Sequence, residues 1–101
     1  MPKRILIVDD ESHIRLLLHR TLEELELEGV EIHFAEDGIG GLSKTRDLKP
    51  DLVLLDVMMP GMNGTDVCAA IRRDPGLVGV HVIILTAKGQ GGALEIGRAH
   101  V

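Results

Sequence analysis

Aromatic residues, cysteines and long apolar runs are nearly absent from this chain of 101 residues. Phe34 is the only aromatic side chain apart from histidines, so the core must be aliphatic. The single cysteine, Cys68, excludes an intramolecular disulfide. No apolar run is long enough to span a membrane, and the chain does not start with a signal-type segment. We therefore expect a protein of the reducing cytoplasm that makes no contact with a membrane.

An excess of positive charge is also lacking. The formal net charge is -5, and the 11 lysines and arginines are scattered along the chain instead of forming a stripe. This distribution argues against direct binding of nucleic acid by this chain. The hydrophobic fraction of 45% and the charged fraction of 27% are typical of a globular protein, and the length allows one domain at most.

Hydrophobic patterning predicts strands that alternate with helices. The apolar runs at 5–8, 52–55 and 80–85 are typical of strands buried on both faces, although His81 interrupts the third. Residues 30–34 alternate between apolar and polar side chains, which indicates a strand at a sheet edge. The segments between these runs have apolar residues at helical spacing, and they cover about 12–25, 39–48 and 67–71. Strict alternation of this kind predicts an α/β fold with a doubly wound parallel sheet.

Oxygen-bearing side chains follow three of the predicted strands. Asp9 and Asp10 come directly after the first, Asp56 follows 52–55, and Thr86 follows 80–85. Because the carboxyl ends of parallel strands meet at one edge of a sheet, we expect these residues to converge at the point where the winding reverses.

Such a cluster of carboxylates needs a cation. Three carboxylates within about 5 Å of one another repel by roughly 3 kcal/mol per pair at an effective dielectric constant of 20. The donors are hard oxygens without cysteine or histidine, so Mg²⁺ or Mn²⁺ fits better than zinc. The backbone carbonyl of Met58 is within reach of an ion held by Asp56. A carboxylate beside such an ion can attack phosphorus and form an acyl phosphate, and the Thr86 hydroxyl can hydrogen-bond the phosphoryl group.

Each residue alone has a simpler explanation. Asp9 and Asp10 precede a helix and could serve as capping and dipole-compensating residues. Asp56 precedes a Pro-Gly loop, where aspartate is common in turns, and Thr86 could be an ordinary hydroxyl at a strand end. Their joint occurrence at three strand ends is what favours a binding site for a cation and a phosphoryl group.

Three segments resemble the receiver domain of bacterial two-component response regulators, of the chemotaxis-receiver type. They are ILIVDDE at 5–11, LVLLDVMMPGMNG at 52–64 and IILTAK at 83–88. The resemblance implies a flavodoxin-like fold with strand order 2-1-3-4. It also implies that Asp56 is the phospho-acceptor, and that Asp10, Asp56 and the Met58 carbonyl hold Mg²⁺, with Asp9 acting through water.

The same resemblance assigns the remaining parts of a phosphorelay. Thr86 is implied as the switch hydroxyl, and the Ala87 backbone N–H as a second contact to the phosphoryl group. The implied donor is a phosphohistidine on a sensor histidine kinase or a phosphotransfer protein. The chain is then a cytoplasmic signalling phosphoprotein and not an enzyme.

The sequence departs from this family after Gln90. No lysine-proline pair and no aromatic residue follow Thr86, although a receiver continues with a fourth helix, a fifth strand that carries both of these features, and a fifth helix. We therefore expect a truncated receiver domain at 1–90, and a tail at 91–101 that is a short helix or a non-native addition. With its neighbour missing, the strand at 80–85 becomes an exposed edge. Such an edge, or an exchanged C-terminal segment, predicts a homo-oligomer.

Two alternative functions stay open at this point. A metal-dependent phosphatase with an aspartate nucleophile would carry a second acid two residues after it, but that position is Met58. A truncated receiver could also act only as a scaffold or assembly module with impaired phosphorylation. Labelling of Asp56 by a small phosphoryl donor distinguishes a working acceptor from such a scaffold.

Overall fold

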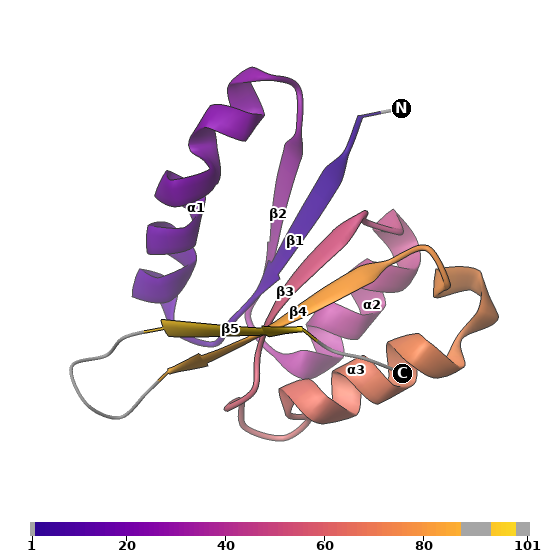
Figure 1. Cartoon of the computed structure of the whole chain (residues 1–101). Helices are drawn as coiled ribbons and strands as arrows, with labels where there is room; N and C mark the ends of the chain where they lie inside the picture. Colours follow the sequence, from indigo (N-terminus) through magenta and orange to yellow (C-terminus); the bar gives the residue numbers. More distant parts are fainter. Residues whose placement is uncertain (1, 88–93, 99–101) are drawn as a thin grey trace.

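A computed structural model describes the backbone of residues 2–87 and 94–98, and the side chains of residues 2–85. Strands and helices alternate along the chain until the last two strands (Figure 1). The strands are β1 (Arg4–Val8), β2 (Glu31–Ala35), β3 (Leu52–Asp56), β4 (His81–Ala87) and β5 (Leu94–Arg98). The helices are α1 (Ser12–Leu27), α2 (Gly38–Leu48) and α3 (Gly64–Arg73), and a 3-10 turn follows at Pro75–Leu77.

The strands form one sheet in the order β2-β1-β3-β4-β5. The first four are parallel to one another, which confirms the α/β class and the predicted order 2-1-3-4. In particular, β1 lies between β2 and β3, so the winding reverses at its carboxyl end. The predicted switch point is therefore present in the fold.

The helices lie on the two faces of this sheet (Figure 1). On one face, α2 and α3 pack over a core that includes Leu6, Val53 and Ile71, all fully buried. On the other face, α1 contributes partly buried leucines that contact Ile7 of β1 and Leu54 of β3. All the buried hydrophobic side chains among residues 2–85 are non-aromatic, as the composition requires.

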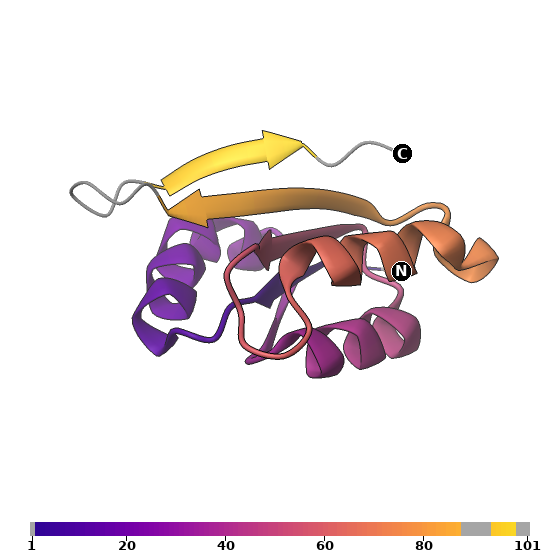
Figure 2. The same cartoon turned by 90° about the horizontal axis from the view of Figure 1, so that it is seen from below.

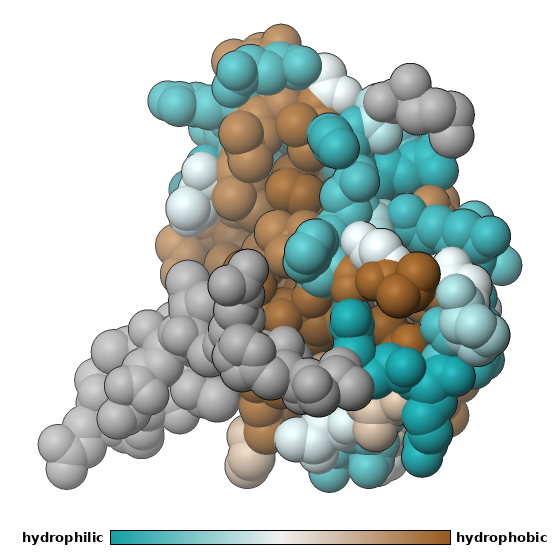
Figure 3. Space-filling model, turned by 45° about the vertical axis from the view of Figure 1, so that its right-hand side comes forward, coloured by the Kyte–Doolittle hydropathy of each residue, from teal (hydrophilic) through white to brown (hydrophobic). Residues whose placement is uncertain are grey.

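The face that carries α1 is only partly covered. Although α1 has 16 residues, none of its side chains is fully buried. Figure 3 shows apolar surface left open on the molecule, and the partly buried Leu52 and Ile83 belong to the apolar layer beside α1. This helix therefore rests on the edge of its sheet face instead of lying in a closed core.

The end of the chain differs from the prediction. Residues Leu94–Arg98 form a strand, so the expected short helix is wrong for this segment. The strand runs antiparallel to β4, with Ala87 paired to Leu94 and Ile83 to Arg98 (Figure 2). The expectation that β4 is an exposed edge is therefore wrong as well, because its free backbone groups find a partner in β5. The proposed boundary at Gln90 stays a prediction.

Local sequence signals mark where the helices begin and end. Gly29 follows α1 with φ at +94°, a left-handed conformation that favours glycine. The side chains of Asp37 and Asn63 cap α2 and α3 by accepting hydrogen bonds from the backbone N–H groups of Gly40 and Asp66. Among the described residues, no helix has the length and apolar character needed to cross a membrane.

Candidate functional site

The three aspartates meet at the carboxyl edge of the sheet. Val8 at the end of β1 pairs with Leu55 of β3, so Asp9 and Asp56 follow neighbouring strands at the same level. One carboxylate oxygen from each of Asp9, Asp10 and Asp56 lies within 4.8 Å of the others. The structure thus brings together three residues that are up to 47 positions apart, as the parallel strand order predicts.

Asp9 is the best anchored of the three. Its backbone N–H donates to the Ala35 carbonyl (3.1 Å), and its Oδ1 accepts from the backbone N–H of Glu11 (2.9 Å). Arg15 on the first turns of α1 donates from Nη1 to the Asp9 carbonyl (2.7 Å). Asp9 is only 4% exposed, whereas Asp10 is exposed. These contacts hold a buried carboxylate in a single orientation beside a more accessible one.

Asp56 is positioned by the loop that follows it. Its Oδ1 accepts from the backbone N–H of Met58 (3.1 Å), which closes a turn over the carboxylate. The backbone N–H of Gly64 donates to the Val57 carbonyl (3.1 Å). A Cβ atom on Gly64 would lie 2.3 Å from the Asp56 carbonyl oxygen, so only glycine permits this approach of α3 to β3. The Met58 side chain is 78% exposed and points away from the core.

The cluster carries unrelieved negative charge. Burial, together with the nearby Asp9, Asp10 and Glu11 carboxylates, raises the pKa of Asp56 to about 6, although the hydrogen bond from Met58 acts in the opposite direction. Burial also raises the pKa of Asp9. Among residues 2–85, no lysine or arginine makes an ion pair with any of the three aspartates. A cation bound among these carboxylates would offset their mutual repulsion.

The donor chemistry of the cluster fits a hard divalent ion. Carboxylate oxygens within 4.8 Å of one another can reach a single ion, and Mg²⁺ takes few protein ligands while it keeps several waters. Sulfur and imidazole ligands are not part of the group. Asp10 is exposed and Asp56 is partly exposed, which leaves one side of the site open to a second molecule.

The structure describes only the backbones of Thr86 and Ala87. Asp56 pairs with Leu85 across β3 and β4, so Thr86 lies one residue beyond the level of Asp56 on the adjacent strand. The Thr86 hydroxyl and the Ala87 side chain lie outside the described part of the structure. Their predicted contacts to a phosphoryl group therefore stay predictions.

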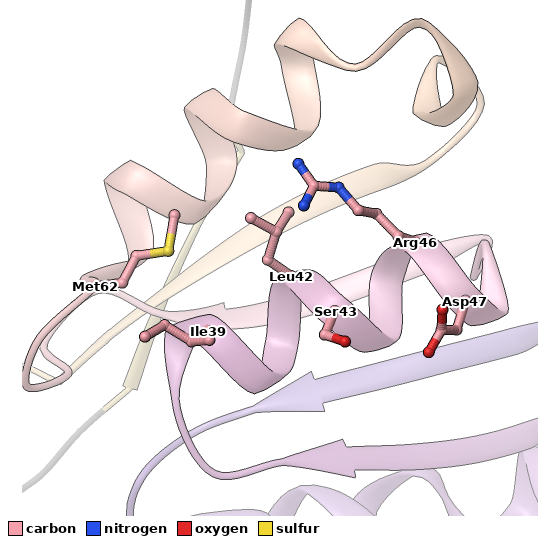
Figure 4. A pocket seen from close by; sticks show the side chains of 6 residues that line it. All are labelled: Ile39, Leu42, Ser43, Arg46, Asp47 and Met62. Carbon is pink, nitrogen blue, oxygen red and sulfur yellow. The ribbon is translucent and has the colours of Figure 1, made fainter.

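A separate groove lies beside α2 and was not predicted from the sequence (Figure 4). It has a volume of about 300 Å³, and none of the three aspartates lines it. Ile39, Leu42 and Met62 form its apolar end, while Arg46 and Asp47 form its polar end. The positioning role of Arg15 was also missed, because its contact to a backbone carbonyl leaves no sequence signal.

Comparisons with known proteins agree with this geometry. Residues 5–97 match the family described as response regulator receiver domain. The DNA-binding response regulator MtrA of Mycobacterium tuberculosis is 46% identical over 88 residues, which are 87% of this chain and 36% of that protein. The transcriptional regulatory protein ResD of Bacillus subtilis is 44% identical over 87 residues, which are 86% of this chain and 34% of that protein. The chain thus spans about a third of the length of these relatives.

Solved structures show the same fold. The response regulator TrrA of Thermotoga maritima, in complex with Mg²⁺ and BeF, is 46% identical with a TM-score of 0.72 over 86% of this chain and 71% of that chain. The chemotaxis response regulator CheY4 of Vibrio cholerae is 29% identical with a TM-score of 0.76, covering 89% of this chain and 72% of that chain.

Proposed function

The chain belongs to the response regulator receiver domain family, and from this premise we propose that Asp56 accepts a phosphoryl group from a phosphohistidine in a Mg²⁺-dependent step. The observation that supports the proposal most directly is the group of three carboxylates within 4.8 Å of one another at adjacent strand ends. Receiver domains are signalling modules of two-component systems, so the transfer is a signalling event and the protein is not an enzyme acting on external substrates.

In the proposed ion site, Asp9, Asp10, Asp56 and the backbone carbonyl of Met58 hold Mg²⁺, with Asp9 acting through water. When bound, Mg²⁺ neutralises part of the carboxylate charge and polarises a phosphoryl oxygen. Asp10 is exposed and Asp9 is buried, so Asp10 is the better placed of the two for direct contact with an ion from solution. A cation held by these side chains would offset the carboxylate repulsion that, together with burial, raises the pKa of Asp56.

Asp56 acts as the nucleophile in the transfer. One carboxylate oxygen attacks phosphorus and a new O–P bond forms, while the P–N bond of the phosphohistidine breaks and the imidazole nitrogen keeps the bonding electron pair and takes up a proton from solvent. The hydrogen bond from Met58 orients the carboxylate before the donor arrives. We propose that the Thr86 hydroxyl and the Ala87 backbone N–H then contact the phosphoryl oxygens.

The proposed partner is a sensor histidine kinase or a phosphotransfer protein. The names of MtrA and ResD describe DNA-binding or transcriptional regulators. We propose that this chain itself takes part in phosphoryl transfer. Because its net charge is -5, we also propose that it does not contact DNA. We also propose a cytoplasmic location, because the proposed donor is a cytoplasmic kinase domain.

Chemical phosphorylation tests the assignment. The chain is incubated with acetyl phosphate or phosphoramidate, with Mg²⁺ or with EDTA, and analysed by intact-mass spectrometry. We expect a gain of one phosphoryl group that requires Mg²⁺ and that is lost in Asp56→Asn. Asp47→Asn on α2 is the matched control, because Asp47 is exposed and outside the acidic cluster, and it should be labelled like the parent.

Two results would contradict the proposal in different ways. Full, metal-dependent labelling of Asp56→Asn would mean that another residue is the acceptor. A parent chain that gains no phosphoryl group under any condition, while it stays folded by circular dichroism, would support a scaffold function without phosphorylation.

A further inference from the structure

The outward face of α1 carries leucines that the core does not use. Leu16, Leu17 and Leu27 are 52%, 51% and 89% exposed. Leu16 and Leu27 are separated by 11 residues, or three turns of helix, and so lie on one face. That face points away from the partly buried leucines that contact the sheet. This face of α1 therefore carries an exposed leucine near each of its two ends.

Charged residues lie between these leucines on the same face, and the two signs are separated along the helix. Arg20 is one turn after Leu16, while Glu23 and Glu24 are one turn before Leu27. All three are exposed, and among residues 2–85 none of them makes an ion pair. The other arginine of α1 is occupied elsewhere, because Arg15 pairs with Glu36, and the two histidines of the helix contact Glu11 and Glu26.

We propose that α1 is a self-association surface, on which a second copy of this chain docks its own α1 in the antiparallel direction. In one register, Leu16 faces Leu27 of the second copy and Arg20 faces Glu23 of the second copy. Two-fold symmetry repeats both pairs, so a single arrangement provides two apolar contacts and two ion pairs. Leu17 and Glu24 flank these pairs and add to the apolar and ionic contacts on one side.

The direction of the second helix follows from the charges. In a parallel arrangement Arg20 would face Arg20 and Glu23 would face Glu23, which is repulsive. The antiparallel arrangement places each cation beside an anion. The intervals of four, three and four between residues 16, 20, 23 and 27 keep all four side chains on one face of the helix.

The interface is small, so the association should be weak. A helix of 16 residues is about 24 Å long, and one helix face buries less surface than a standard protein–protein interface. We expect a dissociation constant on the order of 100 µM for the full chain. Because two of the contacts are ion pairs between exposed side chains, added salt should weaken the association. The acidic site lies at the carboxyl edge of the sheet and is not part of this face, so Asp56→Asn should associate like the parent.

Sedimentation equilibrium over a range of concentrations tests the proposal with charge-reversed chains. Arg20→Glu should place glutamate against Glu23 of the second copy, and Glu23→Arg combined with Glu24→Arg should place arginine against Arg20. Each variant alone should lose self-association by about tenfold or more. An equimolar mixture of the two variants should recover it, because every facing pair then has opposite charges. Arg73→Glu on α3 is the matched control and should behave like the parent.

The mixture makes the test decisive, because loss of folding cannot be repaired by mixing. Leu27→Ser should also weaken association without changing the circular dichroism spectrum. A parent chain that is monomeric at concentrations on the order of 1 mM would overturn the proposal. Charge-reversed variants that associate as strongly as the parent would overturn it too, since they would place the contact elsewhere on the molecule.

Discussion

Replacing Asp56 with asparagine should stabilise the protein at neutral pH in the absence of divalent cations. Asparagine keeps the size of the side chain and an oxygen that can accept the hydrogen bond from Met58 (3.1 Å in the parent). It removes a negative charge that lies within 4.8 Å of two others and that burial penalises. The substitution therefore removes an unfavourable charge without leaving a cavity.

The magnitude follows from the pKa of Asp56. Its value rises from 3.8 to about 6 on folding, so the folded protein binds the proton more tightly than the unfolded chain. Each pKa unit is about 1.4 kcal/mol, which sets an upper bound of roughly 3 kcal/mol for the cost of ionising Asp56 in the folded state. Solvent screening at this half-buried site reduces the expected gain in Asp56→Asn to about 2 kcal/mol.

The extra stability of Asp56→Asn over the parent should increase as the pH rises. Below the unfolded pKa of 3.8, Asp56 is protonated in both states and its contribution to stability is fully present. As the pH rises through about 6, the folded protein loses this proton at a cost, and the parent loses stability relative to Asp56→Asn. The two proteins should therefore be similar near pH 4 and differ most above about pH 7.

Urea denaturation in EDTA, followed by circular dichroism, measures this difference, because the chain has no tryptophan or tyrosine to report by fluorescence. Asp47→Asn controls for the loss of a surface carboxylate. The reasoning is refuted if Asp56→Asn is no more stable than the parent near pH 7.5, or if the difference is equally large near pH 4.

Two further substitutions test the ion site and the loop that follows β3. Mg²⁺ should raise the melting temperature of the parent but have little effect on Asp10→Ala, since the ion binds the folded state through the carboxylate cluster; equal shifts in thermal scans would exclude Asp10 as a ligand. Gly64→Ala should lower the free energy of unfolding by about 2–4 kcal/mol in urea titrations, because its Cβ would lie 2.3 Å from the Asp56 carbonyl oxygen. An unchanged stability would show that α3 can move away from β3 at little cost.

The acidic cluster could be predicted from the sequence because it depends on few geometric rules. Apolar runs ended by Asp9, Asp10 and Asp56 predict buried strands with carboxylates at their ends, and parallel strands bring those ends to one edge. The end of α1 could also be predicted, since Gly29 adopts the positive φ that favours glycine. These features are local in the sequence, or follow from the order of elements alone.

The tertiary structure decided what depends on contacts between distant parts of the chain. The sequence of residues 94–98 is too short for its apolar pattern to distinguish a strand from a helix. The segment is a strand because it pairs with the edge of β4. Likewise, Asp9 and Asp10 are neighbours in sequence, yet only Asp9 is buried under the surrounding segments. Hydrophobic periodicity predicts α1 as an amphipathic helix, but only the tertiary structure shows that none of its side chains is fully buried and that Leu16, Leu17 and Leu27 stay exposed. Strand pairing and burial are set by which surfaces meet in three dimensions, and the local sequence does not contain that information.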